Sequence, residues 1–219
     1  VVGALLAAYG RSGSAHEIAR AAIEIERHDL GLTGGTQDHF AAVFGGVNFL
    51  EFDADDVTVN QLRLPSATIA VLEHNLLLCH LGASRESATI IDDQSDRYEN
   101  GAGNTAAALG RQKDLAVEMK KTLLAGRLDE FGCLLNEAWL AKQELSPLIS
   151  TEAASAAHRT ALEAGALGGK ITGAGGGGYM LFYAPFDCRF EVSQALAEDG
   201  FSVLDVSFDG VGLESWTGE

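Results

Sequence analysis

The sequence has few cysteines and no long apolar run. Its three cysteines, Cys79, Cys133 and Cys188, are an odd number, show no C-x-x-C spacing and lie in or beside apolar runs. We therefore expect reduced, buried packing residues rather than a disulfide framework. No apolar run reaches the roughly 18 to 20 residues that span a bilayer, and no basic stretch precedes the apolar start, as it would in a signal peptide. These absences predict a soluble, cytoplasmic protein.

Positive charge is also scarce. The 15 Lys and Arg residues face 31 Asp and Glu residues, which gives a net charge of -16. Such a chain repels nucleic acid and anionic membranes, so we expect neither as a partner. Any phosphate that the protein binds needs a local cluster of donors. With 219 residues, 47% of them hydrophobic, the chain can bury a core in one or two domains.

An initiator Met is missing as well. Residues 1–9 carry apolar side chains on almost every turn of a helix and show no capping residue. We therefore expect the middle of a helix here, and a chain that is a fragment of a longer protein.

The remaining pattern mixes strands and helices. The residues from Ser14 to Glu17 form a capping box that opens a helix ending near residues 27–30, and Thr36 can cap a short helix through Phe44. The pattern predicts strands at 47–52, 57–64, 75–81, 179–183, 203–208 and 211–216, a helical tract over 86–164 broken near 101–103, 126 and 147, and a helix at 191–197. The change of composition at Pro65 predicts two lobes with a cleft between them.

The strongest chemical signal is the glycine-rich run from Lys170 to Gly178 (KITGAGGGG). Glycines let backbone N–H groups approach an anion closely, and Lys170 adds a positive charge beside them. The run contains G-x-G-x-x-G, but the large apolar residues at 179–183 indicate a buried strand, whereas a dinucleotide site requires a helix. A glycine-rich β-turn without a ligand is the alternative.

A second signal is the run from Gly34 to Asp38 (GGTQD). Asp38 falls in the first turn of the expected short helix, where the helix dipole favours an ionised carboxylate. The paired glycines before it give a ligand close access to the backbone, so this carboxylate could accept a hydroxyl proton. An ordinary helix-terminus aspartate is the alternative.

Glu26 precedes Asp38 by twelve residues. Two carboxylates joined by a loop can face one cleft, with one on a metal ion and the other on a substrate. In the alternative interpretation, Glu26 pairs with Arg27 or Arg20 on a solvated helix face.

Together these segments resemble the GHMP kinases, the family of galactokinase, homoserine kinase, mevalonate kinase and phosphomevalonate kinase. Residues 25–46 contain G-G-x-Q-D followed by A-A-x-F-G-G, most similar to the D-glycero-D-manno-heptose 7-phosphate kinases and related anomeric sugar kinases, and residues 170–182 resemble the third family motif. The resemblance implies an α+β, two-lobed GHMP kinase fold. Residues 1–65 would be the remainder of an N-terminal lobe like ribosomal protein S5 domain 2, and residues 66–219 a C-terminal ferredoxin-like α/β sandwich lobe.

The resemblance also implies roles for individual residues. Asp38 matches the catalytic aspartate of the family, and Glu26 matches its Mg²⁺-binding glutamate. The loop that supports the nucleotide phosphates corresponds to Gly173, Ala174, Gly175 and Gly176, with Lys170 at its entrance. The residues expected to bind substrate are Gly34, Gly35, Gln37, Ser84 and Arg85. For Arg85, a surface residue paired with Glu86 or Asp92 is the alternative.

The implied activity is the phosphorylation, with ATP and Mg²⁺, of a sugar or sugar-phosphate hydroxyl, such as the anomeric hydroxyl of a heptose 7-phosphate-like substrate. The second family motif, P-x-x-x-G-L-x-S-S, holds the triphosphate and is not found between Val1 and Glu219. We therefore expect the full-length parent to be a kinase, and this chain alone to be inactive and to bind ATP poorly.

Other classes of function stay open at this point. A non-catalytic relative would use the cleft only to bind a metabolite. A hydrolase built on Ser84, His80 and Asp92 is disfavoured because no G-x-S-x-G elbow surrounds the serine. The histidines show no metal-ligand spacing, and His39 draws attention only because it adjoins Asp38. A small sugar is the expected partner, and homodimerisation is left open.

Overall fold

The chain forms two compact units. The computed structural model describes residues 1–53, 56–82, 87–101 and 103–216. Unit 1 contains Val1–Arg63 together with the residues from Phe208 onward, and unit 2 contains Leu64–Ser207. The expected division at residue 65 gave the second domain everything up to residue 219, whereas in the structure the C-terminal segment belongs to unit 1.

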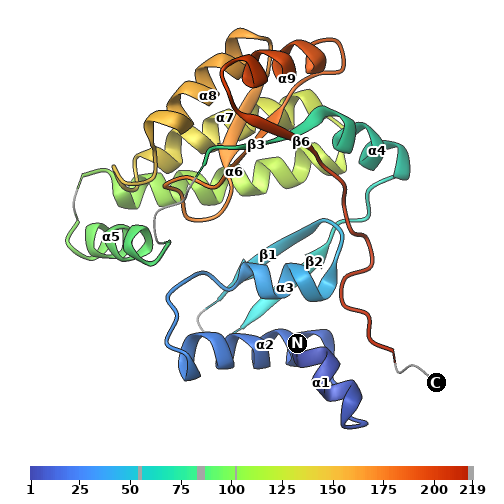
Figure 1. The fold of residues 1–219 in the computed structure, drawn as a ribbon. Coiled ribbons are helices and arrows are strands. Elements are labelled where there is room, and N and C mark those ends of the chain that lie inside the picture. Colours follow the sequence, from blue (N-terminus) through green and yellow to red (C-terminus); the bar gives the residue numbers. More distant parts are fainter. Residues whose placement is uncertain (54–55, 83–86, 102, 217–219) are drawn as a thin grey trace. The chain divides into compact units, whose positions relative to one another are not determined.

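Unit 1 combines helices with a two-stranded hairpin (Figure 1). Its elements are α1 (Val2–Ala8), α2 (Ala15–Ile23), the π-helix η1 (Glu24–Asp29), α3 (Gln37–Phe44), β1 (Asn48–Phe52) and β2 (Val57–Gln61). The two strands pair antiparallel, with Leu50 opposite Val59. Helix α2 packs on α3, and α3 contacts β1.

The start of α2 confirms the predicted capping box. The Glu17 amide donates to Ser14 Oγ at 3.3 Å, and the Ser14 amide donates to the Glu17 carboxylate at 2.7 Å. The expected cap at Thr36 is wrong in one respect, because its side chain makes no capping hydrogen bond. A capping side chain requires an extended backbone, and Thr36 has φ -108° and ψ -2°.

The predicted last strand at 211–216 does not form. This segment is instead joined to unit 1 by individual backbone hydrogen bonds, such as the 2.6 Å bond from the Gly46 amide to the Asp209 carbonyl. Gly45 and Gly212 both have positive φ, and a Cβ on Gly45 would lie 2.2 Å from the Gly212 nitrogen. The chain crosses itself too closely here to leave room for a strand with side chains.

Unit 2 contains a four-stranded antiparallel sheet in the order β4-β5-β3-β6. Its elements are α4 (Ser66–Asn75), β3 (Leu76–His80), α5 (Ser87–Glu99), α6 (Thr105–Leu124), α7 (Leu128–Gln143), α8 (Glu152–Glu163), β4 (Gly168–Ile171), β5 (Tyr179–Tyr183), α9 (Arg189–Glu198) and β6 (Ser202–Asp205). Numbered within the sheet, the strands run 4-1-3-2 from β6 to β4, which is the expected ferredoxin-like arrangement.

The long helical tract is confirmed, with breaks where the glycines and Pro147 predicted them. Helix α4 was not predicted, because Pro65 was interpreted as the end of a strand. Proline also suits the start of a helix, and Pro65 with φ -57° precedes the first residue of α4.

The cysteine prediction is correct in part. No disulfide joins the three cysteines, and Cys79 on β3 is fully buried in the main core. Cys133 is exposed and Cys188 is half-buried, so the prediction of burial is wrong for Cys133, which lies on the solvent side of α7. Among the helices of the described ranges, none has the length and apolarity needed to span a bilayer.

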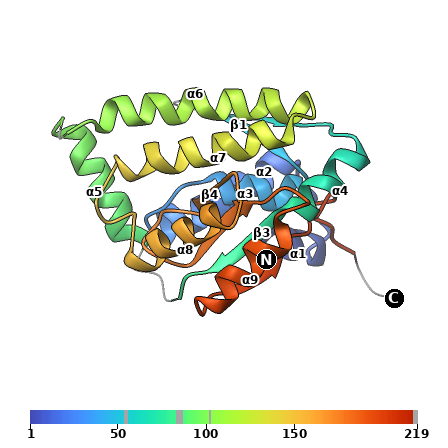
Figure 2. The same ribbon diagram turned by 90° about the horizontal axis from the view of Figure 1, so that it is seen from above.

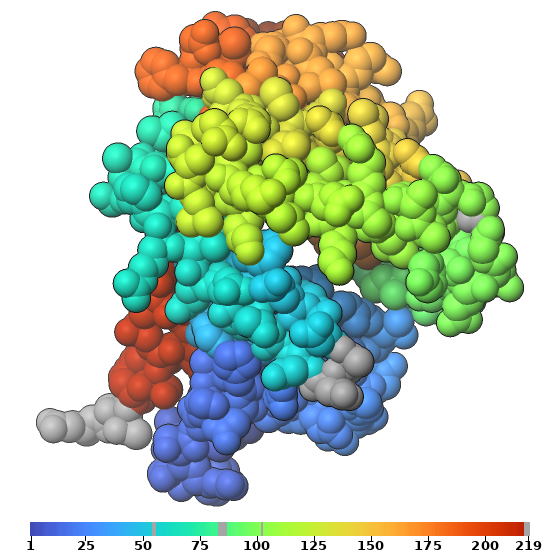
Figure 3. Space-filling model, turned by 180° about the vertical axis from the view of Figure 1, so that it is seen from behind, coloured from blue at the N-terminus to red at the C-terminus, as the bar shows by residue number. Residues whose placement is uncertain are grey.

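Helix α7 lies directly against the sheet. A Cβ on Gly168 of β4 would lie 2.3 Å from the Gly132 carbonyl oxygen of α7, and a Cβ on Gly132 would lie 2.5 Å from the ring of Tyr183. Helix α6 packs along α7 (Figure 2) and forms a large part of the yellow-green face of unit 2 in Figure 3. The glycines therefore let helix and strand backbones touch, which fixes α7 relative to β4.

This contact predicts an asymmetry between two glycine substitutions. Gly168→Ala should lower the free energy of unfolding by about 1–3 kcal/mol, because the new methyl group meets backbone atoms that cannot move aside. Gly110→Ala, on the exposed side of α6 with open space around it, should raise that free energy by roughly 0.8–1 kcal/mol. Urea denaturation measures both, and equal effects would contradict the close contact.

Candidate functional site

Asp38 lies in the first turn of α3 and is exposed. Within the described ranges, its carboxylate makes no hydrogen bond or ion pair. It lines a cavity of about 390 Å³ in unit 1, within the roughly 300–1,000 Å³ typical of small-molecule sites. The residues around this cavity are Val1, Val2, Gly3, Ile18, Ala22, Glu26, Arg27, Asp38, His39, Ala42, Val43 and Leu213.

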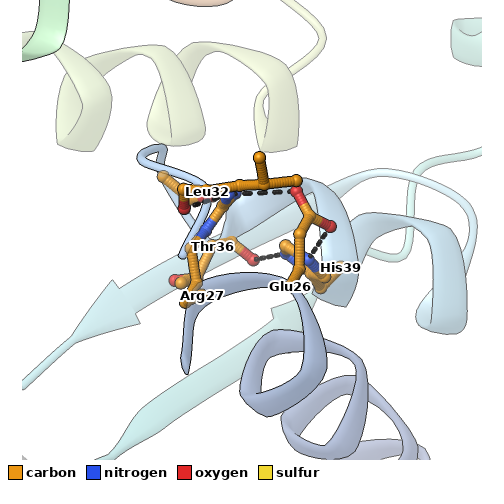
Figure 4. A network of polar contacts seen from close by, with 6 residues as sticks. Glu26, Arg27, Leu32, Thr36 and His39 are labelled. Atoms are coloured by element: carbon orange, nitrogen blue, oxygen red, sulfur yellow. Dashed lines mark hydrogen bonds and ion pairs between the residues drawn. The ribbon is translucent and has the colours of Figure 1, made fainter. Parts of the chain in front are cut away.

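Glu26 lies on η1 and lines the same cavity. Its carboxylate faces His39 Nε2 at 2.8 Å and Arg27 Nη1 at 3.0 Å (Figure 4). The hydrogen bond from His39, followed by the charge of Arg27, lowers the pKa of Glu26 below its usual 4.5. The ion pair with Arg27 that the sequence left as an alternative is therefore present, whereas Arg20 pairs with Asp56 instead.

Arg27 also shapes the loop between the two carboxylates. Its guanidinium donates to the Leu32 carbonyl at 3.0 Å and to the Gly35 carbonyl at 2.7 Å. A Cβ on Gly34 would lie 2.8 Å from Arg27 Nη2, and one on Gly35 would lie 2.2 Å from the side-chain oxygen of Gln37. The glycine pair thus makes room for the side chains of Arg27 and Gln37. The sequence alone did not reveal this reason for two glycines at these positions.

His39 links the π-helix to α3. Its Nε2 faces Glu26, and its Nδ1 lies 3.3 Å from the Thr36 carbonyl oxygen (Figure 4). The side chain is only 9% exposed, whereas that of Glu26 is 40% exposed. His39 therefore serves as an internal support that holds the Glu26 carboxylate at the cavity wall.

Glu26 is the residue of this cavity that the sequence assigned to a metal ion. The described residues include no group of three His, Cys, Asp or Glu side chains that could enclose a cation. Among the described residues, each Glu26 oxygen has one partner and keeps a further lone pair. This fits Mg²⁺ in the way ATP sites bind it, with one or two carboxylates and the remaining ligands from phosphate and water.

The glycine-rich run forms the connection between β4 and β5, followed by a strand as predicted. The Thr172 amide donates to the Tyr179 carbonyl and the Gly176 amide to the Ile149 carbonyl, both at 2.9 Å. The four glycines from 175 to 178 all have positive φ, which other residues adopt only with strain. Amides of this loop that make no hydrogen bond to the described residues include those of Gly173, Ala174, Gly175 and Gly177.

Two lysines lie beside this loop. Lys142 on α7 donates from Nζ to the Gly173 carbonyl, and Lys170 is on β4. Burial, followed by the charge of Lys170, lowers the pKa of Lys142 to about 7, and burial also lowers the pKa of Lys170. Neither ammonium pairs with a carboxylate of the described residues. Lys142 was not predicted from the sequence, because the residues around it do not mark a contact with a glycine 31 positions further along the chain.

The expected residues divide between the two units. Glu26 and Asp38 line one cavity of unit 1, and Lys170 lies beside the glycine loop of unit 2, together with Lys142, which was not expected. A common cleft for both groups stays a prediction. The expected sugar-binding residues Ser84 and Arg85 lie outside the described ranges.

Two models of known protein families match the two segments that contain these groups of residues. A family model described as "GHMP kinases N terminal domain" matches residues 1–46, and one described as "GHMP kinases C terminal" matches residues 119–199. The first range contains both carboxylates, and the second contains both lysines and the glycine loop.

Similar proteins point to the same family. The D-glycero-alpha-D-manno-heptose 7-phosphate kinase of Campylobacter jejuni is 34% identical over 202 residues, which cover 92% of this chain and 59% of the relative. The bifunctional fucokinase/GDP-fucose pyrophosphorylase of Arabidopsis thaliana is 28% identical over 187 residues, covering 84% of this chain and 18% of the relative.

A solved structure extends the similarity to the fold. The crystal structure of a D-glycero-D-manno-heptose 1-phosphate kinase from Bacteroides thetaiotaomicron is 30% identical, with a TM-score of 0.71 over 98% of this chain and 60% of that chain. This chain thus spans about three fifths of that structure and of the Campylobacter relative. Matches to both family models, in order along the chain, together with this shared fold show that the chain belongs to the GHMP kinase family.

Proposed function

We propose that the full-length protein transfers a phosphoryl group from ATP, with Mg²⁺, to a hydroxyl of a sugar or sugar phosphate. The observation that carries the proposal is the pair of carboxylates in one cavity, of which Glu26 is anchored and Asp38 is unpartnered among the described residues. The names of the similar heptose phosphate kinases favour a heptose 7-phosphate-like acceptor, phosphorylated at its anomeric hydroxyl.

In this mechanism Asp38 orients the acceptor hydroxyl and receives its proton. Phosphoryl transfer needs positioning and charge stabilisation more than covalent chemistry, so an exposed carboxylate at a helix N-terminus suits the task. Gly34, Gly35 and Gln37, with Ser84 and Arg85, would contact the sugar.

Glu26 would hold Mg²⁺, which would offset the negative charge of the phosphate groups. His39 and Arg27 keep this carboxylate ionised and fixed at the cavity wall. In unit 2, the free amides of Gly173, Ala174 and Gly175 and the ammonium of Lys170 would donate to phosphate oxygens, whereas the Gly176 amide is bonded to the Ile149 carbonyl.

The catalytic role is tested with Asp38→Asn in the full-length protein. We expect kcat to fall about 10²–10⁴-fold with little change in melting temperature, because the side chain has no partner in the described structure to lose. ADP release is measured with a panel of sugar phosphates. Asp53→Asn, an exposed aspartate that does not line the cavity, is the matched control. Equal activity of the two variants would refute the role of Asp38.

Arg27 is tested as a positioning residue. Arg27→Lys keeps the charge but loses the fork that donates to two carbonyls, so we expect the free energy of unfolding to fall by about 1–2 kcal/mol. We also expect kcat to fall while KM for ATP changes little. Arg20→Lys alters only an exposed ion pair and should change stability by less than about 0.5 kcal/mol. A kcat equal to that of the unmodified protein would contradict the positioning role.

We further propose that this 219-residue chain by itself is inactive and binds ATP weakly, since the sequence contains no P-x-x-x-G-L-x-S-S motif. Calorimetric titration of the chain with Mg·ATP measures the affinity. A dissociation constant in the micromolar range would contradict this proposal.

A further inference from the structure

The packing of α7 on β4 determines where Lys142 meets the glycine loop. Gly132 and Gly168 are in backbone contact, and Lys142, ten residues further along α7, reaches Gly173 in the loop that follows β4. Ten residues of helix rise about 15 Å, and the strand followed by two loop residues can extend by up to about 16 Å. Helix and chain therefore cover similar distances from the glycine contact, which places the ammonium of Lys142 beside the loop.

Lys142 continues a stripe of α7 that is otherwise apolar. Leu135, Ala138 and Trp139 are 4%, 3% and 1% exposed, and Leu145 follows one turn after the lysine. A lysine on such a face costs free energy unless its charge is compensated. The ammonium has three N–H donors, and the bond to the Gly173 carbonyl uses one of them.

A second uncompensated cation lies close by. Lys170 on β4 is near enough for its charge to act on Lys142, and burial makes the charged form of each lysine less favourable. The carboxylates of the described residues nearest along α7 have other partners. Glu137 pairs with Arg111, and Glu144 accepts a hydrogen bond from Asn104, the residue before α6. Two neighbouring ammonium groups in a protein of net charge -16 indicate a local binding site for an anion.

The loop supplies neutral donors at the same place. The amides of Gly173, Ala174 and Gly175 have no acceptor among the described residues, and successive amides in such a glycine-rich turn form an anion-binding concavity. Gly175 is also pressed against Ile149, since a Cβ on it would lie 3.0 Å from the Ile149 Cα. The loop is thus held in position at one side while its free amides remain available.

We propose that Lys142, together with Lys170 and the free amides of the glycine loop, forms a binding site for a phosphoryl dianion. Lys142 is the new element, since it lies outside the glycine-rich run, on helix α7. The inference rests on the proposed function only for the source of the phosphoryl group, which is either the nucleotide or a phosphate on the sugar.

The first test separates anion binding from simple support of the loop. Sulfate serves as the probe because its charge does not change near neutral pH. The amide signals of residues 173–177 are followed by NMR during titration of the full-length protein. Lys142→Gln keeps a donor for the Gly173 carbonyl but removes the charge, so we expect the affinity for sulfate to fall about tenfold or more.

Two further variants control this result. Lys142→Arg keeps the charge and should restore most of the sulfate affinity. Lys121→Gln alters a lysine of α6 that pairs with Glu118, and this variant should bind sulfate as tightly as the unmodified protein. Absence of sulfate binding in the unmodified protein would overturn the site. Equal affinity in Lys142→Gln would overturn the role of Lys142 and leave it as a support of the loop.

Proton uptake provides an independent readout. With a pKa of about 7, Lys142 is largely neutral at pH 8, and a bound anion stabilises its charged form. Sulfate binding at pH 8 should therefore take up protons, and its affinity should fall as pH rises. Calorimetry in buffers with different ionisation enthalpies measures this uptake, which should decrease in Lys142→Gln. Unchanged uptake in that variant would count against Lys142 as the group that gains the proton.

The source of the phosphoryl group is determined by repeating the titrations with ADP and with ribose 5-phosphate. The ligand whose affinity depends on the charge at position 142 identifies the source, and independence of both ligands from it would overturn the proposal. These are binding measurements and need no catalysis. Absence of sulfate binding in the unmodified protein would thus refute the site while leaving the Asp38 test of kinase activity unaffected, and the reverse also holds.

Discussion

The direct contact between the backbones of α7 and β4 is the constraint on which the architecture of unit 2 depends. Gly132 and Gly168 have no side chains at the point of contact, so the helix approaches the sheet more closely than ordinary side chains allow. One turn beyond Trp139, this close approach brings Lys142 to the Gly173 carbonyl. A pair of glycines more than thirty residues apart in the sequence thereby determines the electrostatics of a loop that contains neither of them.

The two candidate sites show opposite electrostatic designs. In unit 1, Glu26 is supported by two cationic or donor side chains, Arg27 and His39, which favour its ionised form. In unit 2, Lys142 and Lys170 lack a carboxylate partner among the described residues. Burial lowers the pKa of both lysines, and the charge of Lys170 lowers the pKa of Lys142 further. The first arrangement suits a cation and a hydroxyl, and the second suits an anion. A kinase that brings Mg²⁺ and phosphate together needs both kinds of site.

Local sequence signals predicted much of the fold because their physical cause is local. The capping box at Ser14 depends on residues three positions apart, and the breaks of the helical tract coincide with glycines or proline. The errors arose where one local pattern suits two structures. Pro65 can end a strand or start a helix, and the apolar residues at 211–216 resemble a strand although Gly212 crosses too close to Gly45 for pairing.

By itself, the sequence determined the family, the two motifs and the carboxylates at positions 26 and 38, because these depend on residue type and spacing along one stretch of chain. Tertiary structure decided which groups support them. Arg27 closes its loop by hydrogen bonds to carbonyls, and every residue presents a carbonyl, so no residue type marks the partner. Lys142 meets the glycine loop only after α7 has packed on β4, and a contact between segments thirty residues apart leaves no pattern in either segment alone.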